Sequence, residues 1–316
     1  MIFSKTGEVK DGFHVLGSVH FPVYLLNSDK PVLFDAGSKL LGAMYLEAIT
    51  AILGRSSPSI LCLTHVHFDH CGAVSYLKKA FPGLKVAASK KAAEIMKRPN
   101  AINLMRRLSE SAAEVLKGYD AGRFVKEPFE AFEPDLILQE GDVIALEEDL
   151  HIQVLETPGH TWDFLSYYVP EKRILVASEA GGCALSSGYI SIDCLTDFDT
   201  YWRSLKRLAA MKADILCQGH RFVYEGEDVS RFLQRSMETA LQFKAMVADL
   251  WRSEKGDLRR VMMRIKELEY DPLPLPKQPE PAYMVNLQAR IKSLVGAKAS
   301  GSEGGSQDQD PGSRTA

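Results

Sequence analysis

Three histidines and one aspartate stand within six positions of one another, directly after a short apolar run. The segment follows the apolar residues 59–63 and reads Thr64-His65-Val66-His67-Phe68-Asp69-His70. Imidazole and carboxylate groups are ligands that suit zinc, iron and manganese. Side chains packed so closely at a turn cannot all face one ion, so alternate residues are expected to serve two. We interpret the segment as a metal site, because chance rarely produces this pattern after a strand.

Further histidines and an acid stand in turn-like motifs elsewhere in the chain. Asp35 lies in the segment LFDAG, His160 lies in TPGHT, and His220 follows Gly219 after an apolar run. Together with residues 65–70, these motifs resemble the H-x-H-x-D-H, T-P-G-H-T and G-H signatures of the metallo-β-lactamase-fold superfamily. The resemblance covers about residues 10–225. It is specific for the fold and only weakly specific for the substrate.

The resemblance implies a pair of metal ions with separate ligand sets. The implied ligands of the first ion are His65, His67 and His160. The implied ligands of the second ion are Asp69, His70 and His220. The family usually has a bridging aspartate between the ions, whereas Glu179 follows the strand-like segment RILVA here. Asp163 and Asp193 are alternative carboxylates, and a partly exposed loop acid is the alternative interpretation of Glu179.

The chemistry expected of such a centre is hydrolysis. Two divalent ions about 3.5–4 Å apart share a water and lower its pKa towards ~7. The resulting metal-bound hydroxide would attack a small ester or acyl-thioester carbonyl, and Asp69 would be the catalytic residue that orients it or accepts its proton. A leaving thiolate, with a pKa near about 8.5, needs little protonation. We therefore predict a dinuclear-metal hydrolase. Its two divalent ions would be zinc ions, or else iron or manganese ions.

Two further features point to a substrate class. The segments HFDHCG and GSVHFPVYLL resemble parts of the quinolone-signal response thioesterases, which are cytoplasmic members of the fold. The glyoxalase II group also carries helices after the final ligand. The resemblance therefore implies a thioesterase that acts on a small-molecule acyl thioester.

Two other functions stay open at this point. Glutamate at the bridging position, as at Glu179, occurs in some di-iron oxidoreductases of the superfamily. A regulatory protein with a residual metal site is the other alternative, because helices at the C-terminal end could present a surface to a partner. Nucleases of the fold usually carry further motifs and a second domain, which this sequence does not show.

The rest of the sequence predicts the elements that hold these side chains. We expect strands at 13–17, 21–27, 31–36, 59–63, 84–89, 136–146, 151–156, 164–169, 173–178 and 213–219. We expect helices at 40–54, 72–80, 89–118 with a break near Pro99, 197–211, 229–250, 258–268 and 282–295. Alternating short strands and helices are typical of an α/β fold. The resemblance specifies it as a metallo-β-lactamase αββα sandwich.

The pattern of the chain changes after residue 225. Residues 1–225 are expected to form the metallo-β-lactamase-like catalytic domain. Residues 226–296 carry apolar side chains at steps of three and four, which is typical of amphipathic helices and predicts a C-terminal helical appendage. Residues 297–316 lack apolar bulk, so we expect them to form a disordered tail.

The overall composition excludes several classes of protein. Hydrophobic residues make up 46% and charged residues 25% of the 316 residues, as in globular proteins. The formal net charge of −3 provides no electrostatic footprint for nucleic acid or an acidic membrane surface. No apolar run approaches the ~18 residues of a membrane span. Five scattered cysteines and an N-terminus without an apolar signal core favour a cytoplasmic protein. Homodimers are common for such folds, although no stretch of this sequence demands one.

Overall fold

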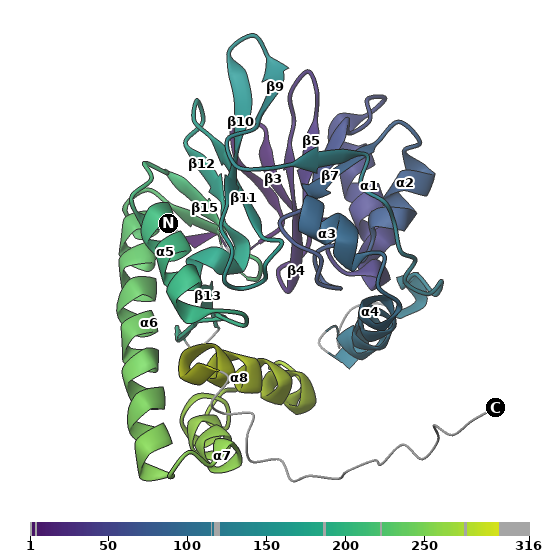
Figure 1. Cartoon of the computed structure of the whole chain (residues 1–316). Helices are drawn as coiled ribbons and strands as arrows, with labels where there is room; N and C mark the ends of the chain where they lie inside the picture. The colour runs from purple at the N-terminus through teal and green to yellow at the C-terminus, as the bar shows by residue number, and fades with distance from the viewer. Residues whose placement is uncertain are drawn as a thin grey trace, which may run out of the picture.

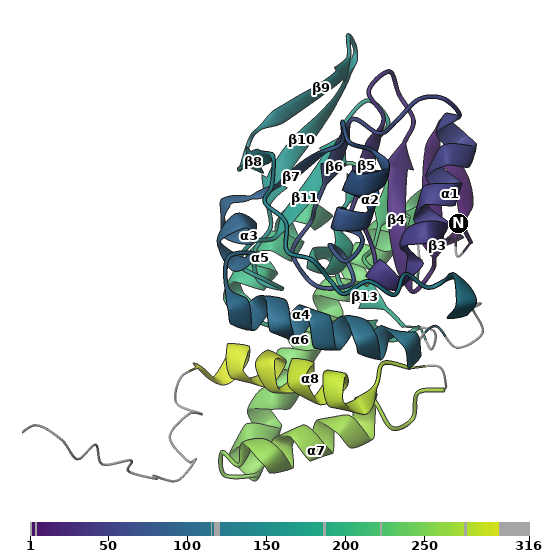
Figure 2. The same ribbon diagram turned by 90° about the vertical axis from the view of Figure 1, so that its right-hand side faces the viewer.

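The computed structural model describes residues 2–3, 5–114, 116, 121–185, 188–221, 223–274 and 277–296. Two seven-stranded sheets face each other, and helices cover both outer faces (Figure 1, Figure 2). In spatial order the first sheet consists of β2 (Gly7–Lys10), β3 (Phe13–Ser18), β4 (Phe21–Leu26), β5 (Val32–Phe34), β6 (Ile60–Cys62), β7 (Lys85–Ser89) and β8 (Leu136–Leu138). The second consists of β1 (Ile2–Phe3), β16 (Val223–Glu225), β15 (Ile215–Cys217), β12 (Ile174–Val176), β11 (Leu165–Val169), β10 (Leu150–Glu156) and β9 (Val143–Glu147). The expected αββα sandwich is confirmed.

Helices lie on both faces of the sandwich and below it (Figure 1, Figure 2). They are α1 (Gly42–Leu53), α2 (Val74–Ala80), α3 (Lys90–Ile95), α4 (Pro99–Ser111), α5 (Phe198–Ala209), α6 (Glu227–Ser253), α7 (Leu258–Glu269) and α8 (Glu280–Val295). Helices α1 and α2 lie beside the first sheet, whereas α5 and α6 lie beside the second (Figure 1). Helices α7 and α8 lie below the sandwich in the same view.

Three apolar clusters correspond to the three interfaces between these layers. The cluster between the sheets contains Phe34 and Val176, while the cluster under α1 and α2 contains Leu33 and Leu61. Successive residues of β5 therefore point to opposite faces, and both faces are buried. Such burial is typical of parallel strands covered by helices, and β5, β6, β7 and β8 pair in parallel.

The third cluster joins the second sheet to the C-terminal helices. Phe243 of α6, Ile265 of α7 and Leu287 of α8 share this cluster with Leu216 of β15. The predicted amphipathic helices are confirmed. Asp257 caps α7, where its side chain accepts a hydrogen bond from the backbone N–H of Arg260.

The structure differs from the sequence prediction at residues 136–146. These residues do not form one strand, because β8 belongs to the first sheet and β9 to the second. Gly141, at φ +83°, turns the chain, and the Asp142 carboxylate accepts a hydrogen bond from the Gln139 N–H. The alternating pattern continues across this turn, so the pattern alone conceals the crossover between the sheets.

Some of the other sequence predictions are confirmed, and the rest stay predictions. A helix break at Pro99 is confirmed, since α4 begins there. The five cysteines are all buried and free. Within the described ranges, no helix combines the length and apolar character needed to cross a membrane. Residues 297–316 lie outside the described residues, and the domain boundaries, the homodimer and the cytoplasmic location stay predictions.

Candidate metal centre

The histidine-rich segment lies in the loop between β6 and α2, beside the end of β5. Asp35 directly follows β5, and its N–H donates to the Cys62 carbonyl at 2.9 Å. Its carboxylate accepts hydrogen bonds from the N–H and the hydroxyl of Thr64, at 2.7 and 2.9–3.0 Å. Asp35 adopts a φ of +59°, a conformation that aspartate tolerates better than most residues. This arrangement holds the start of the segment against the sheet.

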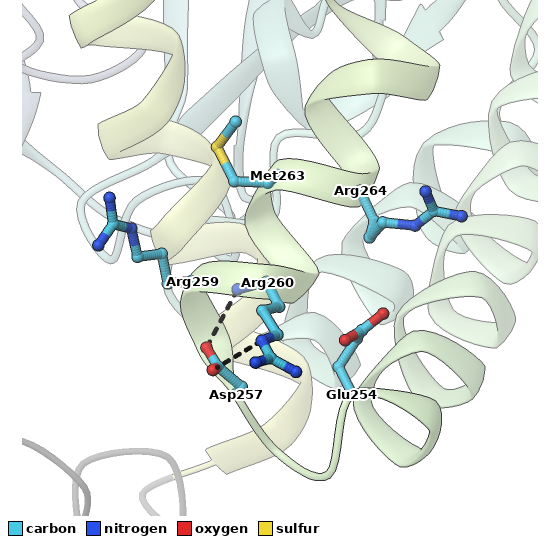
Figure 3. A pocket seen from close by; sticks show the side chains of 6 residues that line it. All are labelled: Glu254, Asp257, Arg259, Arg260, Met263 and Arg264. Atoms are coloured by element: carbon cyan, nitrogen blue, oxygen red, sulfur yellow. Dashed lines mark hydrogen bonds and ion pairs between the residues drawn. The ribbon is translucent and has the colours of Figure 1, made fainter.

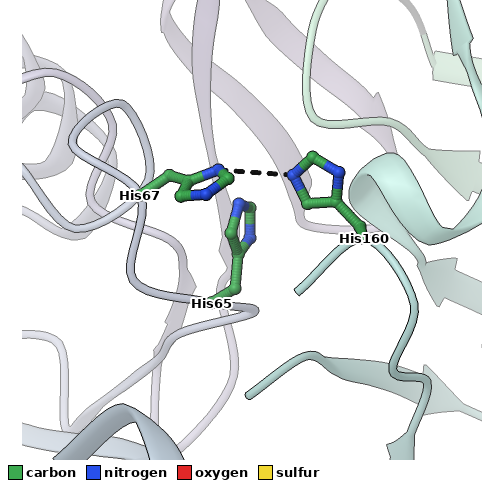
Figure 4. Close-up of side chains that lie close together, drawn as sticks. All are labelled: His65, His67 and His160. Carbon is green, nitrogen blue, oxygen red and sulfur yellow. Dashed lines mark hydrogen bonds between the residues drawn. The ribbon is translucent and has the colours of Figure 1, made fainter. Parts of the chain in front are cut away.

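Three histidines form the first group of potential ligands. The side chains of His65, His67 and His160 converge, with their candidate ligand atoms within 4.8 Å of one another (Figure 4). His160 Nδ1 donates to the Asp193 carbonyl at 2.7 Å. In the neutral imidazole this leaves Nε2 as the unprotonated nitrogen. His160 Nε2 lies 3.3 Å from His67 Nδ1 and faces the centre of the group.

The other predicted ligands form two groups that adjoin the first. One contains His65, His70 and Glu179, and the other contains Asp69, His70 and His220. Glu179 Oε1 lies 2.9 Å from His70 Nε2 and 3.1 Å from His220 Nε2. Asp69 Oδ2 lies 3.5 Å from His220 Nε2. The structure thus brings together all seven residues that the sequence singled out, and the shared histidines make the groups continuous.

Glu179 reaches this centre from a short 3-10 turn, Ser178–Gly181, that follows β12. The Ser178 hydroxyl donates to Glu179 Oε2 at 2.6 Å, and the Tyr201 hydroxyl donates to the Glu179 carbonyl at 3.0 Å. A Cβ on Gly219 would lie only 2.0 Å from Glu179 Oε1. The longer side chain of glutamate therefore occupies the space that a side chain at position 219 would need.

Two backbone carbonyls and one carboxylate orient the outer nitrogens of three histidines. Besides the contact of His160 with Asp193, His220 Nδ1 donates to the His20 carbonyl at 2.6 Å. His70 Nδ1 lies 2.9 Å from Asp35 Oδ2. Such contacts fix the tautomer and ring orientation of metal-binding histidines. The LFDAG motif signalled Asp35, but the two carbonyls have no sequence signature because every residue carries one.

Burial and neighbouring charges shift the pKa values of the residues of the centre in different directions. Burial, together with neighbouring imidazoles, lowers the pKa of His65 well below its usual value and that of His67 to about 3. Burial opposes protonation of His70, but the negative charges of Glu179 and Asp35 raise its pKa. Burial likewise opposes ionisation of Glu179, yet the positive charge on His70 and hydrogen bonds from His220 and His70 lower its pKa. The neutral imidazoles of His65 and His67, together with the ionised carboxylate of Glu179, are donors suited to a divalent cation.

One buried nitrogen without a hydrogen-bond partner indicates that a metal ion would fit the centre. His65 is 1% exposed, and its Nε2 has no hydrogen-bond partner. Buried polar atoms are nearly always paired, so an unpaired one calls for an explanation. The nitrogen lies among the other donors of its groups, where a cation would satisfy it. The residues present therefore fit a metal site.

The alternative carboxylates do not enter these groups. Asp163 Oδ2 accepts a hydrogen bond from the Val66 N–H at 2.9 Å and so supports the histidine segment from outside. The Asp193 carboxylate accepts a hydrogen bond from the Ser191 hydroxyl at 2.8 Å. Among the described residues, Glu179 is the acid that lies between the two histidine sets.

A surface hollow elsewhere has a different character. It lies where α6 turns into α7, and charged side chains together with one methionine line it (Figure 3). The Asp257 side chain in this hollow contacts Arg260. None of its lining residues belongs to the three ligand groups. We therefore assign the chemistry to the histidine cluster.

Substitution of Asp35 by asparagine is expected to weaken metal binding about 10–100-fold, the usual effect of losing a group that orients a ligand. Asparagine carries no charge, and its amide cannot accept hydrogen bonds through both ends from Thr64 and His70. Competition with a chromophoric chelator measures the affinity. Asp197→Asn, at the N-cap of α5, is the matched control and should bind metal as wild type does. Equal affinity of the Asp35 variant and wild type would contradict this role.

Comparisons with known proteins agree with this geometry. Residues 22–220 match the family model of the Metallo-beta-lactamase superfamily. The chain is 29% identical over 199 residues to a hydroxyacylglutathione hydrolase from Rhodopseudomonas palustris, covering 61% of this chain and 60% of that enzyme. It is 32% identical over 126 residues to the human acyl-coenzyme A thioesterase MBLAC2, covering 39% of this chain and 41% of that protein.

A solved structure shares the fold of most of this chain. An archaeal metallo-beta-lactamase superfamily protein from Sulfolobus tokodaii matches with a TM-score of 0.57 at 16% identity, over 90% of this chain and 99% of that one. At such low identity the match shows the fold alone. The family model, by contrast, covers more than half of the sequence and includes every histidine of the centre. The chain therefore belongs to the metallo-beta-lactamase superfamily.

Proposed function

We propose that this chain is a metal-dependent hydrolase of small acyl thioesters. The observation that carries the proposal is the convergence of buried histidine nitrogens, one of them unpaired, on Glu179 and Asp69. The names of two relatives, a hydroxyacylglutathione hydrolase and an acyl-coenzyme A thioesterase, denote hydrolysis of acylated thiols. Because the matched region spans only 60% and 41% of those proteins, the substrate class is part of the proposal.

We assign the ligands in two sets. The proposed ligands of the first ion are His65, His67 and His160. The proposed ligands of the second ion are Asp69, His70 and His220, with Glu179 between the two ions. Zinc is the first candidate for both ions, and iron and manganese suit the same donors. Two ions held here would supply an activated water and a positive charge for the carbonyl oxygen of the substrate.

The side chains of the centre differ in their access to solvent. His70 and Glu179 are 2% and 3% exposed, whereas Asp69 and His220 are 14% and 25% exposed. The buried pair therefore forms the floor of the centre, and the substrate would approach from the side of Asp69 and His220. Asp69 is the proposed catalytic residue, because its carboxylate can orient the attacking water and accept its proton.

Thiol release from a substrate panel tests the proposal. The panel holds acyl-coenzyme A and acyl-glutathione thioesters of increasing chain length, with matched oxygen esters for comparison. The metal-loaded chain should release thiol from at least one thioester, and a chelator should stop the release. Silence across the panel, from protein shown to hold two ions, would contradict thioester hydrolysis.

Glu179 supports a second candidate, a di-iron oxidoreductase. Its carboxylate stands where the superfamily usually has an aspartate, and a change at that position alters the environment of both ions. Iron at both positions in protein purified from its native host would favour this alternative. Zinc at both positions would contradict it. If His67→Ala removes turnover while the fold persists, a purely regulatory role with a residual metal site is also contradicted.

A further inference from the structure

Arg290, near the end of α8, is a buried arginine with every contact directed into the protein. It is 2% exposed. Its Nη1 and Nη2 donate to the two carboxylate oxygens of Glu269 in α7, at 2.9 and 3.2 Å. Its guanidinium carbon lies 4.1 Å from the centre of the Phe243 ring in α6. A two-pronged pair of this kind fixes orientation as well as charge.

The third contact of Arg290 is with a residue outside the C-terminal helices. Its Nε donates to the Ile192 carbonyl at 2.9 Å, directly after β14 (Ile190–Ser191). Tyr189, just before β14, donates its hydroxyl to Glu269. The Ser293 hydroxyl of α8 lies 3.4 Å from Cys194 Sγ. Helices α7 and α8 therefore hold the segment from 189 to 194 at several points.

Asp193, in the same segment, contacts a proposed ligand of the centre. The carbonyl of Asp193, the residue next to Ile192, accepts the hydrogen bond from His160 Nδ1 at 2.7 Å. A displacement of Ile192 would move that carbonyl, because a single planar peptide unit joins the two residues. The carbonyl that Arg290 contacts and the carbonyl that orients His160 therefore belong to adjacent peptide groups.

We propose that Arg290 is a positioning residue for His160 and, through it, for the first metal site. The proposal rests on the function proposed above, because it needs His160 to be a metal ligand. It gives the C-terminal helices a chemical role: their buried ion pair sets the carbonyl that holds one imidazole. The affinity of the first site for metal therefore depends on a side chain 130 residues away in the sequence.

The test compares two variants with a control. Arg290→Met alone would leave the Glu269 carboxylate buried and unpaired, which is strongly destabilising. The double variant Arg290→Met/Glu269→Gln removes both charges and keeps an acceptor for Tyr189. Arg290→Lys keeps a charge but loses the fork. The control is Lys266→Met, since Lys266 also joins α7 to its surroundings, through Asp271 and Glu280, without touching residues 189–194.

Three readouts are taken on each protein: thermal unfolding of the metal-free chain, Zn²⁺ affinity by chelator competition, and the absorption spectrum of the Co²⁺-loaded chain. The double variant should stay folded and show an altered Co²⁺ spectrum. It should bind its first ion about tenfold more weakly, which is the lower end of the effect expected when a contact that orients a ligand is lost. Arg290→Lys should lie between it and wild type. Lys266→Met should match wild type in affinity and spectrum.

The outcomes separate this inference from the proposed function. A folded double variant with the affinity and spectrum of wild type would overturn the positioning role and leave the metal centre intact. Failure of wild type itself to bind Zn²⁺ or Co²⁺ would overturn both. An equal loss of affinity in Lys266→Met would also overturn the inference, because the effect would then reflect general loosening of α7 and α8.

Discussion

Substitution of Asp69 by asparagine is expected to lower kcat for thioester hydrolysis by about 10²–10⁴-fold, the usual contribution of a general base. The physical reason is that asparagine has almost the same shape as aspartate but cannot accept a proton from the attacking water. Asp69 is also a proposed ligand, beside His220. Metal content measured on the same samples therefore separates the loss of a base from the loss of a ligand.

An exposed acid provides the matched control for this experiment. Asp199 lies on α5 with a side chain that is 78% exposed, and Asp199→Asn should leave kcat unchanged. The informative comparison is a variant at position 69 that retains two ions. Turnover within a few-fold of wild type in that protein would rule out Asp69 as the catalytic residue.

Substitution of Gly219 by alanine is expected to disrupt the centre directly at Glu179. The added Cβ would lie 2.0 Å from Oε1 and 2.5 Å from Cδ of Glu179. The carboxylate is buried between His70 and His220, so it cannot move without breaking those contacts. We expect metal affinity to fall at least about tenfold and the free energy of unfolding to fall by about 1–3 kcal/mol, as for other overpacked sites.

The chain offers both a control and a rescue for this prediction. A Cβ on Gly181, in the same turn as Glu179, would meet its nearest atoms at an ordinary 3.5 and 3.6 Å, so Gly181→Ala should be mild. The double variant Glu179→Asp/Gly219→Ala shortens the acid by one methylene and should recover part of the lost affinity. Chelator competition and thermal unfolding measure both effects. Equal behaviour of the variants at 181 and 219 would show that Glu179 does not fill this space.

The predictability of the site followed the chemistry of its residues. The segment 64–70 reveals itself because several ligand types follow a short buried strand, and the fold brings His160 and His220 to it as the motifs imply. Glu179 was a harder prediction, because an acid after a strand is common. The Glu179 carboxylate fits at the centre because Gly219, 40 residues later, has no side chain. The spacing of residues in the sequence does not reveal such a contact.

The fold was predictable where one residue pattern had one structural meaning. Apolar runs marked the buried strands, and the spacing of apolar residues marked α6 and α7. The crossover at Gly141 was not predictable, because alternation looks the same whether neighbouring strands share a sheet or not. The carbonyls of His20 and Asp193 were also out of reach, since only the folded backbone brings them to the imidazoles.

The most direct test of the account is a stepwise metal titration followed by thiol release. Metal-free chain receives Zn²⁺, Mn²⁺ or Fe²⁺ in fractions of an equivalent, and bound metal and turnover are measured at each step. The account predicts no turnover without metal, and a rise that is complete when two ions per chain are bound. Full turnover in the metal-free chain, or two bound ions with no turnover of any thioester, would contradict it.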